Sequence, residues 1–361
     1  MTEHVLIIRL SAIGDVAMVV PVVFSAAKQY PNVHFTVLSK PFARPFFDGL
    51  AHNVSFMGAD VKGEYHGVHG LNKLYRRLMA KNFTAIADLH DVLRSKYLRT
   101  RFNFSFTDSC RVAHINKHRG DKHRLCAYNN KVKQQLPTSF QNYCDVFAEL
   151  GYPVKLDFKS IFPEHGGDMS VLPEAFRSDR PQGQKWIGIA PFAAHEWKVY
   201  PLDMMEKVIA LLTKAHPSCR IFFFGGGKKE MDTFDEWCGR YPQCTNASAV
   251  LGGLSNELVL MSHLDVMLSM DSGNMHMAAI TGIPVVSVWG ATHTFAGFAP
   301  WGQPKDNIVE VDLPCRPCSV YGNKTCRRGD FACMRTISPE TIVRTLESKL
   351  FEKPSDKVND K

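Results

Sequence analysis

Residues 4–21 read HVLIIRLSAIGDVAMVVP, and this stretch decides the fold class. Its first part, residues 4–10, is an apolar run with the length of a buried strand. A short loop with Gly14 and Asp15 follows, and residues 17–31 show the apolar spacing of a helix that ends at Pro31. A buried strand that passes through such a loop into a helix predicts a βαβ unit and a parallel sheet.

The same alternation of strand and helix continues along the chain. Residues 34–40 and 83–90 are expected strands of the first half. In the second half, we expect strands at 186–192, 220–227, 264–271 and 284–290, and helices at 202–216, 276–282 and 339–351. The sequence therefore predicts an α/β protein with two Rossmann-like domains that face a central cleft, where the carboxyl ends of both sheets meet.

The length of 361 residues also favours two domains. Between the two halves, the pattern changes to proline, glycine and charged residues, which is typical of a linker. We expect an N-terminal domain at 1–165, a linker at 166–185, a C-terminal domain at 186–335, a terminal helix at 336–352 and a polar tail at 353–361.

The charge of the chain is unevenly distributed. Of the net charge of +8, residues 94–133 alone carry +9, because eleven Lys and Arg face only Asp108 and Asp121 there. An anionic partner and a solvated loop with spare charge both explain such a stretch. The first residues, MTEH, lack the basic start of a signal peptide, and no apolar run reaches the roughly 18 residues of a membrane span, so we expect a cytoplasmic protein.

Gly14 and Asp15 are the first candidate site residues. Asp15 would lie at the carboxyl end of the first strand, where its carboxylate could take a proton from a hydroxyl group. Gly14 would permit a tight turn and a close approach of the backbone to a ligand. The alternative role for Asp15 is helix capping, which is common for aspartate before a helix.

A second group of candidates lies in residues 269–290, SMDSGNMHMAAITGIPVVSVWG. The expected strand ends at Asp271, and Ser272 and Gly273 open a helix that carries His276. Backbone amides at a helix start, together with a serine hydroxyl, form a site for an anion such as a diphosphate. The alternative is a capping Asp-Ser pair followed by a histidine of the core.

Two more candidates follow strands of the second half. Lys198, in PFAAHEWKVYP (191–201), could neutralise a departing diphosphate without a metal ion, or could be an ordinary surface lysine. Glu230, in FFFGGGKKE (222–230), could accept hydrogen bonds from ribose hydroxyls, as acidic residues do in dinucleotide-binding folds. Its alternative is a solvated glutamate at the start of a helix.

Missing motifs exclude other nucleotide enzymes. The chain has no G-x-G-x-x-G after its first strand and no G-x-x-x-x-G-K-[ST], which disfavours a nicotinamide dehydrogenase and a P-loop NTPase. No Asp-x-Asp pair is present to bridge a divalent metal to a sugar diphosphate. We therefore expect neither a cofactor nor a catalytic metal.

Four of the ten cysteines form a cluster in the sequence. Cys315, Cys318, Cys326 and Cys333 have the spacing C-x2-C-x7-C-x6-C. This spacing is compatible with a structural zinc ion, but reduced, packed thiols are the favoured interpretation, and we predict no metal site there. The other six cysteines are scattered singly, as expected of buried small apolar residues.

Together, these segments resemble glycosyltransferase family 9, the lipopolysaccharide heptosyltransferase family, which has the glycosyltransferase-B fold. The most specific matches are RLSAIGDVAMVVP near the start, WK-x-x-P in the middle and MDSGNMHMAAITGIPVVSVWGAT near the end. The resemblance implies that Asp15 is the general base, that Lys198 lies beside the donor phosphates and that Glu230 contacts the donor nucleoside.

The remaining matches concern the donor and the acceptor. The family signature Asp-Thr-Gly-x-x-His corresponds to Asp271, Ser272, Gly273 and His276, with serine in place of threonine. Arg94 lies in DLHDVLRS (88–95), which resembles the family segment D-L-x-x-x-x-R-S on the acceptor side. The chain departs from the family at Ala193 and Ala194, where hydroxyl residues are frequent, so these two positions offer no side-chain hydroxyl to the donor phosphates.

The resemblance implies a metal-independent enzyme that moves heptose from ADP-heptose, with inversion, onto a lipopolysaccharide core or lipid A-type acceptor. The partners would be a nucleotide-sugar donor, an anionic lipid-linked saccharide and, through the latter, the cytoplasmic face of the inner membrane as a peripheral contact. A nucleotide-sugar epimerase of the same architecture is the alternative enzyme. A nucleic-acid-binding protein would stack bases on aromatic residues of the basic stretch, namely Tyr97, Phe102, Phe104 and Phe106; we expect no nucleic acid.

Overall fold

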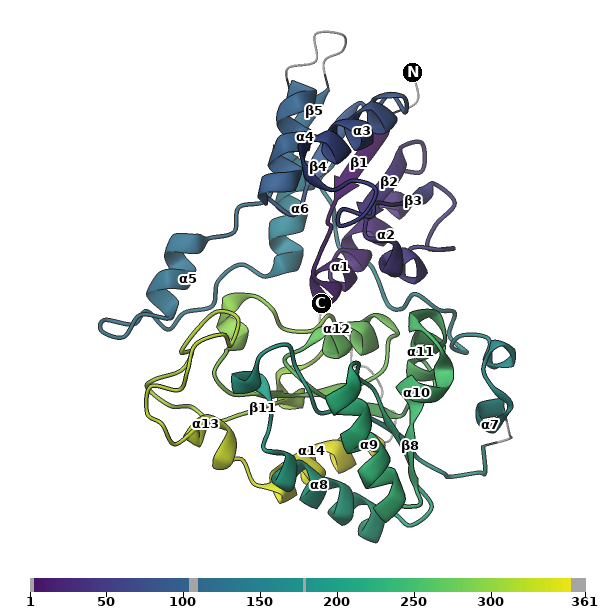
Figure 1. Cartoon of the computed structure of the whole chain (residues 1–361), viewed down its shortest axis with the longest axis vertical. Helices are drawn as coiled ribbons and strands as arrows, with labels where there is room; N and C mark the ends of the chain where they lie inside the picture. Colours follow the sequence, from purple (N-terminus) through teal and green to yellow (C-terminus); the bar gives the residue numbers. More distant parts are fainter. Residues whose placement is uncertain (1–2, 104–109, 178–179, 352–361) are drawn as a thin grey trace. The chain divides into compact units, whose positions relative to one another are not determined.

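The computed structural model describes residues 3–103, 110–177 and 180–351. The chain forms two compact units, each built on its own parallel sheet (Figure 1). Unit 1 comprises Met1–Asp121, Gln135–Ile161 and Gly297–Trp301, and unit 2 comprises Lys122–Gln134, Phe162–Ala296 and Gly302–Lys361. The prediction of an α/β chain with two parallel sheets is confirmed. The functional domains and their expected limits stay predictions, and the polar tail 353–361 lies outside the described residues.

The sheet of unit 1 has the order β3-β2-β1-β4-β5, and all its pairings are parallel. Its strands are β1 (His4–Ile8), β2 (His34–Ser39), β3 (Val54–Gly58), β4 (Ala85–Asp88) and β5 (Arg111–His114). The sequence did not predict β3 and β5. Both are edge strands with partly exposed residues, so they lack the continuous apolar run that marks a strand buried on both faces.

The helices of unit 1 are α1 (Ile13–Ala17), α2 (Val20–Gln29), α3 (Gly67–Met79), α4 (Leu93–Asn103), α6 (Ser139–Glu149) and the start of α5 (Arg119–Leu125), which continues into unit 2. The expected helix at 17–31 is wrong in its limits, because the chain forms two helices with a break after Ala17. Pro21 is the second residue of α2, where its missing amide hydrogen costs no helical hydrogen bond. Helices α3 and α4 pack side by side (Figure 1).

The sheet of unit 2 has the order β11-β10-β9-β6-β7-β8, again with parallel pairings. Its strands are β6 (Trp186–Ala190), β7 (Arg220–Phe223), β8 (Cys244–Asn246), β9 (Val266–Met270), β10 (Val285–Trp289) and β11 (Ile308–Glu310). This is the strand order of a Rossmann fold, and it reverses between β6 and β9, as the order of unit 1 reverses between β1 and β4. Ligands of such sheets bind at the carboxyl ends of the strands that flank this switch point.

The helices of unit 2 are α7 (Glu174–Arg177), α8 (Leu202–Ala215), α9 (Lys228–Arg240), α10 (Ala247–Leu251), α11 (Leu254–Met261), α12 (Gly273–Ile280), α13 (Ala332–Arg335) and α14 (Pro339–Leu350). Helix α14 packs against α8 (Figure 1), and the buried Tyr200 hydroxyl donates to the Ile337 carbonyl at 2.6 Å. Among the described residues, no helix combines the length and the apolar character that a bilayer crossing requires.

Candidate functional site

Asp15 lies at the carboxyl edge of the unit 1 sheet, in the first turn of α1. Its carboxylate pairs with the Arg9 guanidinium at 2.6 Å and accepts a hydrogen bond from the Ala12 amide at 3.1 Å. Arg9 also donates to the Leu89 carbonyl at 2.7 Å, so it ties the loop after β1 to the loop after β4. The Asp15 side chain is 30% exposed and that of Arg9 only 8%. Asp15 therefore closes the start of the helix and still presents a carboxylate to solvent.

Gly14 does not make the tight turn that the sequence suggested. Helix α1 already begins at Ile13, so Gly14 is buried within its first turn. The chain changes direction before the helix, where the N-cap residue Ala12 is extended with φ −81° and ψ −178°. The expectation of a glycine turn is wrong because the helix starts earlier than the apolar pattern of residues 17–31 indicates.

His90 lies beside this edge and was not identified from the sequence. Its Nδ1 accepts a hydrogen bond from the Leu10 amide at 3.3 Å, and its Nε2 is 3.4 Å from the Ser11 hydroxyl oxygen. Burial, and then the charges of Arg9 and Lys117, lower the pKa of His90 to about 3, so the imidazole is neutral. His90 is the last residue of the segment 83–90 that was predicted as a strand. This position at the end of a strand was the only feature of the sequence that could have identified it as a site residue.

Acids after β4 neutralise part of the basic stretch 94–133. Arg99 pairs with Asp88 at 3.0 Å and with Asp91 at 3.1 Å. Asp91 also pairs with Lys96 at 3.4 Å and with Arg119 at 3.2 Å. Cations still predominate at this edge. The carboxylates of Asp15, Asp88 and Asp91 lie among five cations, namely Arg9, Lys96, Arg99, Lys117 and Arg119. The chain's own acids thus neutralise part of the stretch, and an anionic partner for the remaining positive charge stays a prediction.

Arg94 lines a cavity of about 500 Å³ between the starts of α3 and α4. Its lining residues are His66, Gly67, Val68, Leu71, Val92, Leu93, Arg94 and Tyr97. The Leu93 and Val68 side chains are 84% and 64% exposed. Arg94 is exposed, and no carboxylate in the described part of the chain pairs with it. The cavity thus combines apolar walls with an available guanidinium group.

Lys198 and Asp271 form an ion pair at the carboxyl edge of the unit 2 sheet. Their Nζ and Oδ2 atoms are 3.0 Å apart, and the side chains are only 14% and 8% exposed. The Thr292 hydroxyl donates to the same Asp271 oxygen at 2.7 Å. The three residues follow β6, β9 and β10, so the sheet brings together segments distant in the sequence. Lys198 is therefore not an ordinary surface lysine.

The start of α12 lies directly after Asp271. Ser272 is the N-cap residue, but its side chain makes no capping hydrogen bond and lies 3.2 Å from the Ser269 hydroxyl. Gly273 is the first helical residue, and the first turn contains no acid. The first amides of a helix have no partner within the helix, so this start can receive an anion. His276 follows within the same helix and is buried.

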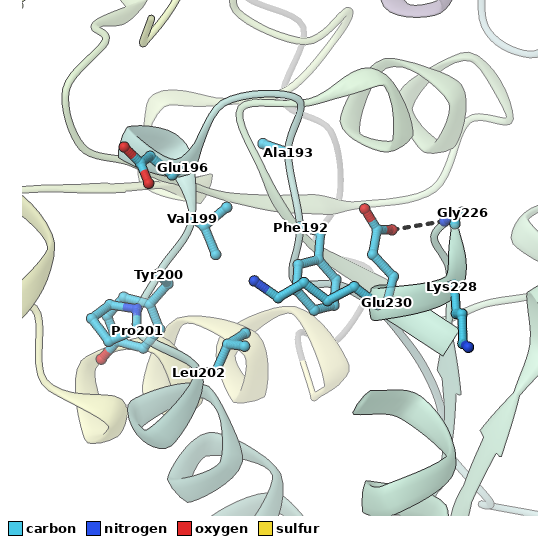
Figure 2. A pocket seen from close by; sticks show the side chains of 12 residues that line it. Phe192, Ala193, Glu196, Val199, Tyr200, Pro201, Leu202, Gly226, Lys228 and Glu230 are labelled. Atoms are coloured by element: carbon cyan, nitrogen blue, oxygen red, sulfur yellow. Dashed lines mark hydrogen bonds between the residues drawn. The ribbon is translucent and has the colours of Figure 1, made fainter. Parts of the chain in front are cut away.

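Glu230 lines a second cavity, of about 520 Å³, in unit 2 (Figure 2). Its carboxylate accepts a hydrogen bond from the Gly226 amide at 2.7 Å, and burial raises its pKa. The complete lining is Phe192, Ala193, Glu196, Val199, Tyr200, Pro201, Leu202, Gly226, Gly227, Lys228, Lys229 and Glu230. The sequence did not identify the apolar wall around Phe192 and Leu202, although Phe192 lies within the predicted Lys198 segment and Leu202 directly follows it.

The cysteines show no metal site. None of the ten, all of which lie in the described part of the chain, forms a disulfide, and among residues 3–103, 110–177 and 180–351 no three His, Cys, Asp or Glu are placed to hold a metal ion. Burial raises the pKa of the Cys318 thiol, and it raises that of Cys333 to about 12. Burial of Cys318 and Cys333 fits the interpretation of packed thiols.

The aromatic residues of the basic stretch do not form a base-stacking surface where they can be placed. Phe102 is 4% exposed and packs against Tyr75 in the core of unit 1. The Tyr97 hydroxyl donates to the Asn72 side chain at 2.7 Å. Phe104 and Phe106 lie outside the described residues.

Comparisons with known proteins point to one family. The sequence model of glycosyltransferase family 9 (heptosyltransferase) matches residues 71–327. Lipooligosaccharide heptosyltransferase 2 of Campylobacter jejuni is 25% identical over 250 residues, which cover 66% of this chain and 70% of that protein. A family 9 glycosyl transferase from Veillonella parvula matches with TM-score 0.68 and 17% identity over 98% of both chains. The E. coli ADP-heptose lps heptosyltransferase II matches with TM-score 0.67 and 16% identity, over 96% of this chain and 98% of that chain, and such likeness shows the fold.

Proposed function

The chain belongs to glycosyltransferase family 9, the heptosyltransferase family, and on this premise we propose that it moves heptose from ADP-heptose to a lipopolysaccharide core or lipid A-type acceptor. The enzyme is a glycosyltransferase. The observation that carries the proposal is the enclosed Lys198–Asp271 pair beside the open start of α12, because it holds the Lys198 ammonium in a defined place beside helix amides that can receive a diphosphate.

Asp15 is the proposed base. The acceptor hydroxyl oxygen forms a bond to the anomeric carbon on the face opposite the diphosphate, and its proton passes to the Asp15 carboxylate. The bond from the anomeric carbon to the diphosphate oxygen breaks with inversion, and ADP leaves with the electron pair. The exposed fraction of Asp15 allows contact with a hydroxyl, and the Arg9 pair fixes the direction of the carboxylate.

The departing diphosphate is the proposed ligand of the unit 2 edge. Lys198 and the amides that follow Ser272 would stabilise its charge, and one such donor is typically worth about 3 kcal/mol. We propose that these groups serve without a divalent metal. The cavity beside Glu230 would hold the nucleoside, with its carboxylate accepting hydrogen bonds from ribose hydroxyls. Ala193 supplies no hydroxyl to this cavity, so phosphate contacts depend more on Lys198 and α12.

The acceptor is the proposed ligand of unit 1. Arg94 and the cations around Asp91 suit the carboxylates and phosphates of an anionic saccharide, and the apolar part of the Arg94 cavity suits a lipid-linked one. Because such an acceptor is held in a bilayer, we also propose peripheral contact with the cytoplasmic face of the inner membrane.

A transfer assay tests the function and its enzyme alternative together. The protein is incubated with ADP-heptose and lipopolysaccharide from a heptose-deficient strain, and mass spectrometry follows the acceptor, with and without EDTA. We expect one added heptose in both cases. The proposal fails if the acceptor is unchanged, and formation of an epimer from ADP-heptose alone would favour the epimerase. Thermal shifts with ADP, UDP and GDP identify the nucleotide.

A further inference from the structure

A segment rich in cysteine, residues 313–331, connects β11 to α13 and has no part in the function described so far. We call it the cysteine segment. It packs on the carboxyl edge of the unit 2 sheet, where the Cys318 amide donates to the Ala291 carbonyl at 2.8 Å. Lys131 holds it from another side by donating to the carbonyls of Cys315 and Pro317, both at 2.7 Å. The segment is therefore attached beside the proposed diphosphate site.

Arg316 anchors this segment through a guanidinium group that is completely buried. The group donates to the carbonyls of Gly290 at 2.5 Å and Thr292 at 3.0 Å, and also to that of Val311. It pairs with the Glu310 carboxylate at 2.8 Å. Removal of a buried, fully bonded charge would leave these carbonyls without donors, so Arg316 fixes the turn that follows β10.

The turn after β10 contacts the ion pair of the site through Thr292. The Thr292 hydroxyl donates to the same Asp271 oxygen that pairs with the Lys198 ammonium. A chain of contacts thus runs from Arg316 through Thr292 and Asp271 to Lys198. Each link is a hydrogen bond or ion pair of 3.0 Å or less.

Gly322 of the cysteine segment lies directly on the Lys198 side chain. A Cβ added at Gly322 would be 2.4 Å from Lys198 Cγ and 2.6 Å from its Cδ, closer than real Cβ contacts. Only glycine leaves room for the lysine stem at this position. The Gly322 amide donates to the Ser319 hydroxyl at 2.8 Å, which holds the glycine in place. The cysteine segment therefore restricts the conformations of the Lys198 stem, while Asp271 restricts the position of its ammonium group.

We propose that the cysteine segment is a positioning element for the diphosphate lysine. Gly322 acts by packing on the Lys198 stem, and Arg316 acts through Thr292 and Asp271. A lysine side chain has high rotamer entropy, so a lysine that is already ordered binds an anion at lower cost. The segment should therefore favour the binding of the diphosphate and not that of the nucleoside. This inference depends on the proposed function for the ligand of Lys198.

Two glycines of the cysteine segment provide a matched test. Gly322 and Gly329 have φ of 75° and 78°, so alanine is strained similarly at both positions. A Cβ at Gly329 would meet no atom within 4 Å. Calorimetric titration of Gly322→Ala, Gly329→Ala and the unsubstituted protein with ADP and with adenosine separates the two effects. We expect Gly322→Ala to weaken ADP binding about tenfold with adenosine unchanged, and Gly329→Ala to change neither.

A second pair of variants covers the case in which Gly322→Ala does not fold. Thr292→Val removes the hydroxyl that holds Asp271 and keeps the side-chain shape, whereas Thr292→Ser restores a hydroxyl. We expect Thr292→Val to weaken ADP binding several-fold at unchanged adenosine binding, and Thr292→Ser to recover most of the loss.

The results separate this inference from the proposed function. If the unsubstituted protein binds ADP no better than adenosine, the diphosphate site itself is refuted. If it prefers ADP but the Gly322 and Thr292 variants do so equally, the positioning role is refuted while the site stands. A parallel loss of ADP and adenosine binding in folded variants would also refute it, because that is a general structural effect.

Discussion

The two sheets place charged residues at equivalent points of the same topology. In unit 1, Asp15 follows β1 and Asp88 ends β4, and in unit 2, Lys198 and Asp271 follow β6 and β9. Their surroundings differ. The Asp15 side chain is 30% exposed beside Arg9, whereas the side chains of the Lys198–Asp271 pair are 14% and 8% exposed. The switch point of unit 1 presents the accessible Asp15 carboxylate among cations. The switch point of unit 2 encloses the Lys198 ammonium, which is held by Asp271.

This difference indicates which step each edge serves. An accessible carboxylate can meet a hydroxyl group that arrives with a large acceptor. An enclosed lysine, fixed by Asp271 and covered by Gly322, provides a charge whose position is set before the ligand binds. We therefore expect substitutions in unit 1 to affect proton transfer and acceptor binding, and those in unit 2 to affect the donor.

The largest effect is expected for Asp15→Asn. The amide keeps the size of the side chain but cannot take a proton, so kcat should fall by about 10²–10⁴. Initial rates at saturating donor and acceptor measure this fall. The control is Asp48→Asn, an exposed acid of unit 1 that pairs only with Arg44 among the contacts described, and it should keep full activity. Near-normal turnover of Asp15→Asn would remove Asp15 as the base.

Lys198→Met should have the next largest effect. Loss of one preorganised charge at the diphosphate corresponds to about 3 kcal/mol, or roughly a hundredfold in transfer rate. Single-turnover measurements with excess enzyme separate this loss from product release. The matched control is Lys207→Met, because Lys207 is an exposed lysine of α8. A loss of similar size in both variants would show that the enclosed position of Lys198 has no special role.

Arg94→Ala should have a smaller effect, confined to the acceptor. We expect the acceptor KM to rise about tenfold at low salt with donor KM unchanged, and the difference to shrink as salt screens the exposed charge. Arg76→Ala is the control, because Arg76 is an exposed arginine of α3 that does not line the cavity. A rise in donor KM instead would show that Arg94 serves the donor, and would contradict its assignment to the acceptor.

The smallest effect concerns pH. Burial raises the pKa of Glu230, so its carboxylate becomes protonated at a higher pH than an ordinary glutamate. Since an ionised carboxylate accepts stronger hydrogen bonds from ribose hydroxyls than a protonated one, donor KM should rise as pH falls through this raised pKa. Glu230→Gln should have a donor KM a few-fold higher near pH 7 and should lose this low-pH rise. If Glu230→Gln shows the same rise in donor KM at low pH, a group other than Glu230 causes the rise, and the prediction is contradicted.

The sequence predicted the parts of this protein that local patterns encode. The apolar runs of β1, β6, β9 and β10 are buried along their length, and the charged residues at their ends follow from parallel topology. Short edge strands such as β8 and β11 have three residues each, too few for a recognisable pattern. The break between α1 and α2 was also missed, because apolar residues continue across it.

The links within the site could not be predicted for a different reason. Thr292 meets Asp271 across two neighbouring strands, and Arg316 reaches Thr292 from a segment that enters only after β11. Nothing in the cysteine spacing indicates that Gly322 lies against Lys198, or that Arg316 bonds to the turn that carries Thr292. Such contacts depend on tertiary packing and become visible only in the folded chain.

The most direct test of the account is a calorimetric titration of ADP into Asp15→Asn and Lys198→Met beside the unsubstituted protein. The account predicts that Asp15→Asn binds ADP as the unsubstituted protein does, while Lys198→Met binds it about tenfold more weakly or worse. If ADP affinity is lost in Asp15→Asn and retained in Lys198→Met, the assignment of the acid to the acceptor and of the enclosed lysine to the donor is contradicted.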